Sequence, residues 1–278
     1  MRLSISNIAW DVQEDQAAVE LFRRYGVDAI DIAPGKYFPR PAEATSSDVN
    51  QVKDWWNERG MDIVGMQALL FGLTGLNVFG TKESQTQLLT HLDAVCRIGG
   101  ELGATRVVFG SPKNRDRSGL DDQVAFEIAV SFFQRLAVIA ASHGVTVCLE
   151  PNPPRYGSNF MINSATTAQV VKAVNHQNIK MQFDTGALTI NEEDPVSTLL
   201  AYANLIGHIH ASEPDLVPLG DGLTAHQAMA DAIELYLPAH LVTVEMVASK
   251  NEPHLLAIER ALHVAVNAYR ATLSKGTQ

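Results

Sequence analysis

The sequence has few cysteines, a shortage of positive charge and no long hydrophobic run. Cys96 and Cys148 are too few for a disulfide framework, and their spacing does not resemble a metal-binding motif. Across 278 residues, 31 Asp and Glu outnumber 21 Lys and Arg, which gives a net charge of −10. Because sequence-independent affinity for nucleic acids comes from Lys and Arg, this argues against a nucleic-acid partner. No stretch approaches 18 uninterrupted apolar residues, which argues against a membrane partner.

Signals of export and of nucleotide binding are also missing. Residues 1–10 hold no basic segment followed by an apolar core, so we expect a soluble, cytoplasmic protein. The first expected strand and turn lack G-x-G-x-x-G, and G-x-x-x-x-G-K-[ST] occurs nowhere. These absences argue against an open, doubly wound nucleotide-binding sheet.

The chain does contain a recurring unit in which an amphipathic stretch ends at glycine and a β-rich run follows. Gly26, Gly60, Gly103 and Gly144 mark four such boundaries, 34, 43 and 41 residues apart. Glycine ends helices readily because it adopts the left-handed conformation without a Cβ penalty. Each copy therefore predicts a helix followed by a strand, as in a parallel α/β sheet.

Continued along the chain, this rhythm predicts eight strands with a helix after each. The expected strands are 3–10, 29–32, 63–66, 107–109, 145–147, 179–184, 205–211 and 241–247. In the second half the expected helices are 165–174, 195–202, 225–236 and 253–273. Eight units of about 35 residues suit a barrel of about 250 residues. With no Pro/Ser/Gly-rich linker, we predict an α/β fold, a (β/α)₈ TIM barrel, with residues 1–278 as one domain.

Polar side chains end the last four expected strands. Because side chains alternate along a strand, they face the barrel axis, at the carboxyl end where barrel active sites form. These residues are Glu150, Asp184, His210 and Glu245. Three carboxylates crowded together need a compensating charge, and a divalent cation supplies it. Three oxygen ligands and one imidazole suit Mn²⁺, Co²⁺, Mg²⁺ or Zn²⁺, and the lack of thiolates argues against a structural zinc.

Other residues at this barrel face are candidates for binding a substrate. Asn152 and Arg155 follow Glu150 and are candidate hydroxyl contacts. Basic residues after the fourth and second strands are candidates for a phosphate, with a solvated loop as the alternative: Lys113, Arg115, Arg117, Lys36 and Arg40. Aromatic residues after the first three strands are candidates for a sugar-pocket wall, with loop packing as the alternative: Trp10, Tyr37 and Phe71.

His208 stands two residues before His210 and therefore faces the axis one layer deeper. That position favours a core group or one that supports the metal ligands. We keep it among the candidate substrate-binding residues, with Asn152, Arg155, Trp10 and Lys113.

Several segments together resemble a known family. They are Leu149-Glu150-Pro151-Asn152, Phe183-Asp184-Thr185-Gly186, Gly207-His208-Ile209-His210, Val244-Glu245 and the loop Pro218-Leu219-Gly220-Asp221-Gly222. In order and spacing they resemble the xylose-isomerase-like barrels of sugar phosphate isomerases and epimerases. That superfamily includes ketose 3-epimerases, hydroxypyruvate isomerase and inosose dehydratase. The resemblance covers nearly the whole chain and is more specific for the superfamily than for a substrate.

The resemblance implies a divalent-metal-dependent isomerase or epimerase of a small sugar or sugar phosphate. By it, Glu150, Asp184, His210 and Glu245 bind the metal, and Glu150 and Glu245 double as the acid/base pair. Proton abstraction next to a carbonyl would proceed through a metal-stabilised enediolate.

The chain also departs from the ketose-epimerase pattern at two places. Ala187 stands where that subgroup carries a substrate-contacting histidine, and residues 214–216 lack an arginine expected there. These departures argue against a ketohexose 3-epimerase and leave the metal core unaffected.

Three alternatives stay open. They are a lyase that dehydrates an inosose-like polyol in the same metal site, a phosphodiesterase like the apurinic-site endonucleases, and a non-catalytic sugar-binding barrel. The net charge of −10 and the single convincing histidine ligand argue against the phosphodiesterase. Barrels of this kind often pair through their helices, so a homo-oligomer is a further candidate assembly.

Overall fold

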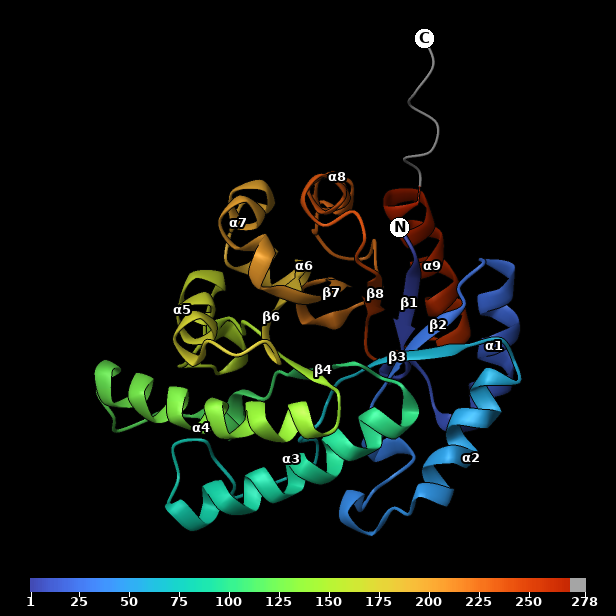
Figure 1. The fold of residues 1–278 in the computed structure, drawn as a ribbon. Helices are drawn as coiled ribbons and strands as arrows, with labels where there is room; N and C mark the ends of the chain where they lie inside the picture. Colours follow the sequence, from blue (N-terminus) through green and yellow to red (C-terminus); the bar gives the residue numbers. More distant parts are fainter. Residues whose placement is uncertain (271–278) are drawn as a thin grey trace.

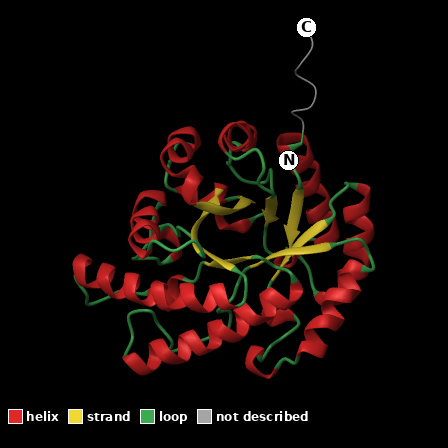
Figure 2. Ribbon diagram, in the orientation of Figure 1, coloured by secondary structure: helices red, strands yellow, loops and turns green. Residues whose placement is uncertain are grey.

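Eight short parallel strands lie at the centre of the molecule, and helices surround them (Figure 1, Figure 2). The computed structural model describes residues 1–270. The strands pair in chain order, and β8 pairs with β1 to close the barrel. The strands are β1 Leu3–Ser6, β2 Ala29–Ile32, β3 Asp62–Met66, β4 Arg106–Phe109, β5 Thr146–Leu149, β6 Ile179–Asp184, β7 Ile206–Ser212 and β8 Val242–Glu245. The predicted (β/α)₈ barrel is confirmed.

The helices form the outer ring, and the β6–β7 connection holds two of them. They are α1 Asp15–Arg24, α2 Ser46–Asn57, α3 Lys82–Leu102, α4 Asp122–Ser142, α5 Ser164–Val174, α6 Thr185–Ile190, α7 Pro195–Tyr202, α8 His226–Tyr236 and α9 His254–Tyr269. All four glycines predicted to end helices have positive φ, between 63° and 88°. The last helix was expected over 253–273, of which 271–273 lie outside the described residues.

Polar side chains cross the interior of the barrel below its mouth. His208 Nε2 on β7 lies 2.6 Å from Asp31 Oδ2 on β2, and both side chains are buried. Because β2 and β7 are not neighbours, both residues must point into the barrel. Gly65 on β3 leaves the space, since a Cβ there would lie 2.6 Å from Asp31 Oδ1. The predicted inward orientation of His208 is therefore confirmed.

Helix α4 covers the barrel and is the one helix within residues 1–270 that is long and apolar enough to cross a membrane. Its Phe132 and Phe133 are buried, and the Phe133 ring packs edge-on against Phe109 of β4 at 5.4 Å. Core helices of soluble proteins meet the same criterion. Both cysteines, Cys96 and Cys148, are buried and unpaired.

Candidate metal and active site

The four residues predicted as metal ligands meet at the carboxyl ends of β5 to β8. Glu150 directly follows β5, Asp184 and Glu245 end β6 and β8, and His210 lies within β7. One nitrogen or oxygen of each side chain lies within 4.8 Å of the others. His210 Nδ1 is 3.8 Å from Glu150 Oε1, 3.9 Å from Asp184 Oδ2 and 3.2 Å from Glu245 Oε2. The barrel therefore brings three carboxylates and one imidazole around a single point.

Burial and mutual repulsion act on the charges of this cluster. Burial raises the pKa of Asp184 well above its ordinary value, and the nearby charges of Glu245 and Glu150 raise it further. Burial and Glu245 also raise the pKa of Glu150. Burial opposes the charged form of Glu245 as well, but His210 outweighs it and lowers that pKa. One imidazole cannot balance three buried carboxylates, so this oxygen-rich donor set fits a divalent cation.

Neighbouring side chains hold each carboxylate in place. Gln67 Nε2 donates to Glu245 Oε1 at 2.6 Å, and Asn152 Nδ2 donates to Glu150 Oε2 at 2.8 Å. Ser212 Oγ lies 3.0 Å from both oxygens of Asp184 and donates to that carboxylate. Hydrogen bonds of this kind orient metal ligands and raise metal affinity. The carboxylates are thus pre-arranged toward the shared point.

Asp184 also connects the cluster to the backbone. It caps α6, where its Oδ1 accepts a hydrogen bond from the Ala187 N–H at 2.6 Å. At the end of β4, Gly110 provides room for Glu150, since a Cβ there would overlap the Glu150 carboxylate. The start of α6 therefore binds Asp184 through a backbone N–H, and the glycine after β4 leaves space for Glu150.

The sequence reasoning missed Gln67, Ser212 and Asp31. The strand-alternation rule places Ser212 on the same side as His210, two residues earlier, and places Asp31 inward on β2. Gln67 directly follows β3, at the same barrel face. Strand alternation predicted the four ligands, and the same rule applied to these three residues would have placed them inside the barrel or at its mouth.

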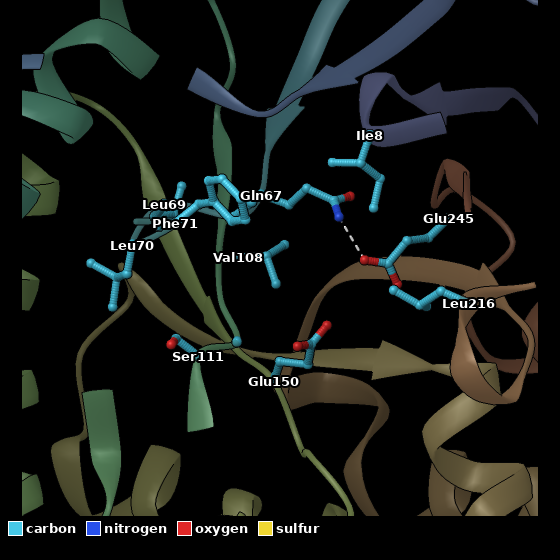
Figure 3. Close-up of a pocket in the computed structure, with 12 residues that line it drawn as sticks. Ile8, Gln67, Leu69, Leu70, Phe71, Val108, Ser111, Glu150, Leu216 and Glu245 are labelled. Atoms are coloured by element: carbon cyan, nitrogen blue, oxygen red, sulfur yellow. Dashed lines mark hydrogen bonds between the residues drawn. The ribbon is translucent and has the colours of Figure 1, made fainter. Parts of the chain in front are cut away.

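Two connected pockets open at this end of the barrel. The apolar pocket, of about 250 Å³, has a wall of apolar side chains and includes Glu150 and Glu245 (Figure 3). Its apolar side chains are Ile8, Leu69, Leu70, Phe71, Val108 and Leu216. The polar pocket, of about 460 Å³, shares Gly110, Glu150, Leu216 and Glu245 with it. The polar pocket adds Asn152, Tyr156, Asp184, Glu213 and Asp215.

Among the candidate substrate residues, Asn152 lines the polar pocket and Arg155 lies beside it. Arg155 pairs with Asp215, which lines that pocket. His208 is buried beneath the mouth against Asp31 and lines neither pocket. The structure therefore places His208 as a core group, which was the favoured reading of its position.

The expected phosphate-binding cations do not assemble at the mouth. Arg115 is buried and donates to the Asn152 side chain. Lys36 donates to the backbone carbonyls of Asn7 and Trp10. Lys113 is exposed and lines neither pocket. The other two, Arg117 and Arg40, bind the Asn159 carbonyl and the Glu43 carboxylate respectively.

Of the three expected aromatic wall residues, the structure places Phe71 at the mouth. Phe71 lines the apolar pocket with 89% of its surface exposed. Trp10 is fully buried, packs against Phe22 at 5.2 Å, and donates its Nε1 to Asp15 at 2.7 Å. Tyr37 donates its hydroxyl to the same Asp15 at 2.9 Å. Trp10 exposes no surface to a substrate, so we withdraw it as a sugar-binding residue.

Glu213 fastens the loop that follows β7. Its Oε1 accepts from the Gly220 N–H at 2.9 Å and lies 3.0 Å from His226 Nε2, while its Oε2 accepts from the Thr224 N–H at 2.9 Å. Burial opposes ionisation, but these hydrogen bonds outweigh it and lower the pKa of Glu213 to about 2. The loop includes residues 218–222, one of the segments that carried the family resemblance, and Glu213 itself lines the polar pocket.

Replacing Glu213 with glutamine is expected to destabilise the protein by about 2 kcal/mol at about pH 7, and by less at low pH. An acid with a lowered pKa contributes stability that is complete above its ordinary value of 4.5 and is lost as the pH falls toward 2. Urea unfolding of both proteins at about pH 7 and about pH 3.5 measures the difference. The same difference at both pH values would contradict this account.

Fold and site together define a class: a (β/α)₈ barrel with a candidate metal group at the carboxyl ends of its last four strands. The model of the xylose isomerase-like TIM barrel family matches residues 19–264. The chain therefore belongs to this family, as the resemblance implied.

Individual relatives agree with this assignment. A D-psicose 3-epimerase from Ruminiclostridium cellulolyticum is 30% identical over 95 residues, which cover 34% of this chain and 32% of that protein. The match thus spans about a third of that relative.

Solved structures resemble nearly the whole chain. A D-psicose 3-epimerase with D-tagatose, from Clostridium cellulolyticum H10, has a TM-score of 0.79 at 17% identity and covers 98% of this chain and 99% of its own. The 3-keto-D-glucoside 4-epimerase from E. coli has a TM-score of 0.80 at 16% identity, with coverages of 96% and 99%. The IOLI protein with a zinc atom has a TM-score of 0.76 at 18% identity, with coverages of 99% and 100%. At these identities the likeness shows the fold.

Proposed function

We propose that this protein is a divalent-metal-dependent epimerase or isomerase of a small keto-sugar. The observation that carries the proposal is the meeting of Glu150, Asp184, His210 and Glu245 within 4.8 Å at the barrel mouth. The solved neighbours include epimerases of ketoses and of a keto-glucoside, and one neighbour contains zinc. A metal-dependent proton transfer on a keto-sugar accounts for the cluster of acids, for the epimerases among the neighbours and for the neighbour that contains zinc.

In this proposal, four side chains bind the metal and two of them also transfer protons. Glu150, Asp184, His210 and Glu245 would hold the cation, which would supply positive charge to stabilise an enediolate. Glu150 and Glu245 approach the shared pocket from different strands, so one can remove the proton next to the carbonyl and the other can return it (Figure 3). Each transfer contributes about 10²- to 10⁴-fold to the rate. Gln67 and Asn152 keep these two carboxylates aimed at the substrate.

The test is a proton NMR experiment in D₂O with a panel of ketoses, aldoses and their phosphates. The metal-free protein and the protein with Mn²⁺, Co²⁺, Mg²⁺ or Zn²⁺ are compared. We expect metal-dependent entry of deuterium at the carbon next to the carbonyl, together with formation of an epimer or isomer. Product formed without deuterium would contradict proton abstraction, and loss of one water from the product would indicate a lyase.

Other parts of the assignment rest on the sequence. A cytoplasmic location, the absence of nucleic-acid and membrane partners, and the single-domain organisation of residues 1–278 stay predictions. So does a homo-oligomer formed through the outer helices. Size-exclusion chromatography with light scattering measures the assembly directly.

A further inference from the structure

The two pockets at the barrel mouth share Glu150 and Glu245 and differ in the side chains that lie beyond these acids. The polar pocket offers hydrogen-bonding groups from Asn152, Tyr156 and Asp215. The apolar pocket faces the acids with Leu69, Leu70 and Phe71. Figure 3 shows these three side chains on the far side of the apolar pocket from Glu245. A molecule held at the acids can therefore extend in a polar and in an apolar direction.

Apart from the two acids, the apolar pocket has two polar side chains, Gln67 and Ser111, and each makes a hydrogen bond within the protein. Gln67 donates its Nε2 to Glu245, while its Oε1 is buried away from solvent without a hydrogen-bond partner. Ser111 donates its hydroxyl to Asn114 Oδ1 at 2.6 Å. A sugar hydroxyl that entered this pocket would lose its hydrogen bonds to water and find few replacements, which is unfavourable.

The mouth is also unsuited to a phosphate. Within residues 1–270, every charged side chain that lines either pocket is acidic. Arg155 is paired with Asp215, and Arg115, although two of its guanidinium nitrogens have no hydrogen-bond partner, is buried behind Asn152 and lines neither pocket. Apart from the proposed metal ion, whose charge the carboxylates already balance, the two pockets offer a phosphate no cationic side chain, which disfavours its binding.

Phe71 is the exposed end of the apolar wall. Leu69 and Leu70 are 5% and 4% exposed, whereas Phe71 is 89% exposed. A large aromatic ring in water gains free energy when an apolar group covers it. A ligand that reaches from Glu150 and Glu245 along this wall is in a position to cover it, because both acids line the same pocket.

From these observations we infer that the substrate is an uncharged keto-sugar with an apolar group at the end remote from the reacting carbon. The apolar group lies in the apolar pocket against Phe71, and the hydroxyl-bearing part lies in the polar pocket. A deoxy terminus and an apolar aglycone of a keto-glycoside both have this chemistry. The inference rests on the proposed function, because it assumes that the reacting carbon is held at Glu150 and Glu245.

The test combines turnover with equilibrium binding by calorimetry, with and without metal. One arm compares a ketose with its 6-deoxy and 6-phosphate forms, and the other compares a keto-glucoside carrying a methyl aglycone with one carrying a phenyl aglycone. Each ligand is measured with the wild type and with Phe71→Ala. The control is Leu200→Ala, which removes a leucine of α7 that is 72% exposed.

We expect the phenyl glycoside to bind about 10-fold or more tightly than the methyl glycoside, a typical effect of added apolar contact. Phe71→Ala should remove most of this preference, and Leu200→Ala should leave it intact. The 6-phosphate should bind at least about 10-fold more weakly than its parent. If the protein prefers the 6-deoxy ketose but not the phenyl glycoside, the apolar group of the substrate is a deoxy terminus. If it prefers the phenyl glycoside but not the 6-deoxy ketose, the apolar group is an aglycone.

Three outcomes would overturn the inference. The first is tighter binding of the 6-phosphate than of its parent ketose. The second is no preference for the apolar member of either pair. The third is that Phe71→Ala affects all ligands equally and also changes the oligomeric state. The last would assign Phe71 to an interface between copies. Apolar preference in binding without any turnover would instead reject the proposed function alone, and turnover without that preference would reject this inference alone.

Discussion

Asp184→Asn is expected to weaken divalent-metal binding by more than about 100-fold and to raise the stability of the metal-free protein. Without metal, burial and the charges of Glu245 and Glu150 raise the pKa of Asp184, so its ionised form is unfavourable in the folded state. An acid with a raised pKa stabilises the fold below its ordinary pKa, and this contribution is lost as the pH rises through the folded value. Near neutral pH, the uncharged asparagine removes the cost of burying an ionised carboxylate. It also removes the carboxylate that would bind the metal.

Thermal unfolding with and without Mn²⁺ measures both effects. The wild type should gain stability from metal, and Asp184→Asn should start higher and gain little. Asp194→Asn is a matched control, since Asp194 caps α7 through the Ser197 N–H at 2.7 Å as Asp184 caps α6. Asparagine serves as well as aspartate at such a cap. An unchanged metal response in Asp184→Asn would exclude the cluster as the metal site.

Glu150→Gln and Glu245→Gln are each expected to reduce turnover by about 10²- to 10⁴-fold. If the two acids serve opposite faces of the substrate, each variant should still exchange deuterium with one epimer and fail with the other. This pattern separates loss of one proton-transfer group from general damage to the site, which would reduce exchange with both epimers.

The measurement is proton NMR in D₂O with each epimer separately, at metal concentrations at which calorimetry shows binding. Glu58→Gln, at the surface-exposed end of α2, is the control and should behave as the wild type. Full turnover in either active-site variant would remove that glutamate from the proposed acid/base pair.

Local patterns in the sequence predicted the barrel well. Strands 29–32 and 179–184 match β2 and β6 residue for residue, because short apolar runs bounded by glycine and polar residues carry the signal. The first strand was expected to continue to residue 10, but β1 ends at Ser6. Residues 7–9 form a short 3₁₀ turn instead, which Ser6 caps by accepting a hydrogen bond from the Ile8 N–H. The run of apolar residues did not reveal this turn.

The positions of the four expected ligands were also predictable. In a closed parallel barrel the carboxyl ends of all strands lie at one face, so an inward polar residue at each end must approach the others. The alternation of side chains along each strand and the order of the strands are sufficient for this prediction. It places Glu150, Asp184, His210 and Glu245 together, as the structure does.

By itself, the sequence determined the fold class and the residues that gather at the barrel mouth, because periodicity and strand ends are local properties. Only the tertiary structure decided which nearby side chains are free to meet a substrate. Arg115, Lys36 and Trp10 follow strands as a substrate-binding residue would, yet Arg115 and Lys36 are held by partners 37 and 29 residues away, and Trp10 is buried with its Nε1 donating to Asp15. The path of each loop sets those partnerships, and no local pattern encodes it. Phe71 remains exposed for the same reason.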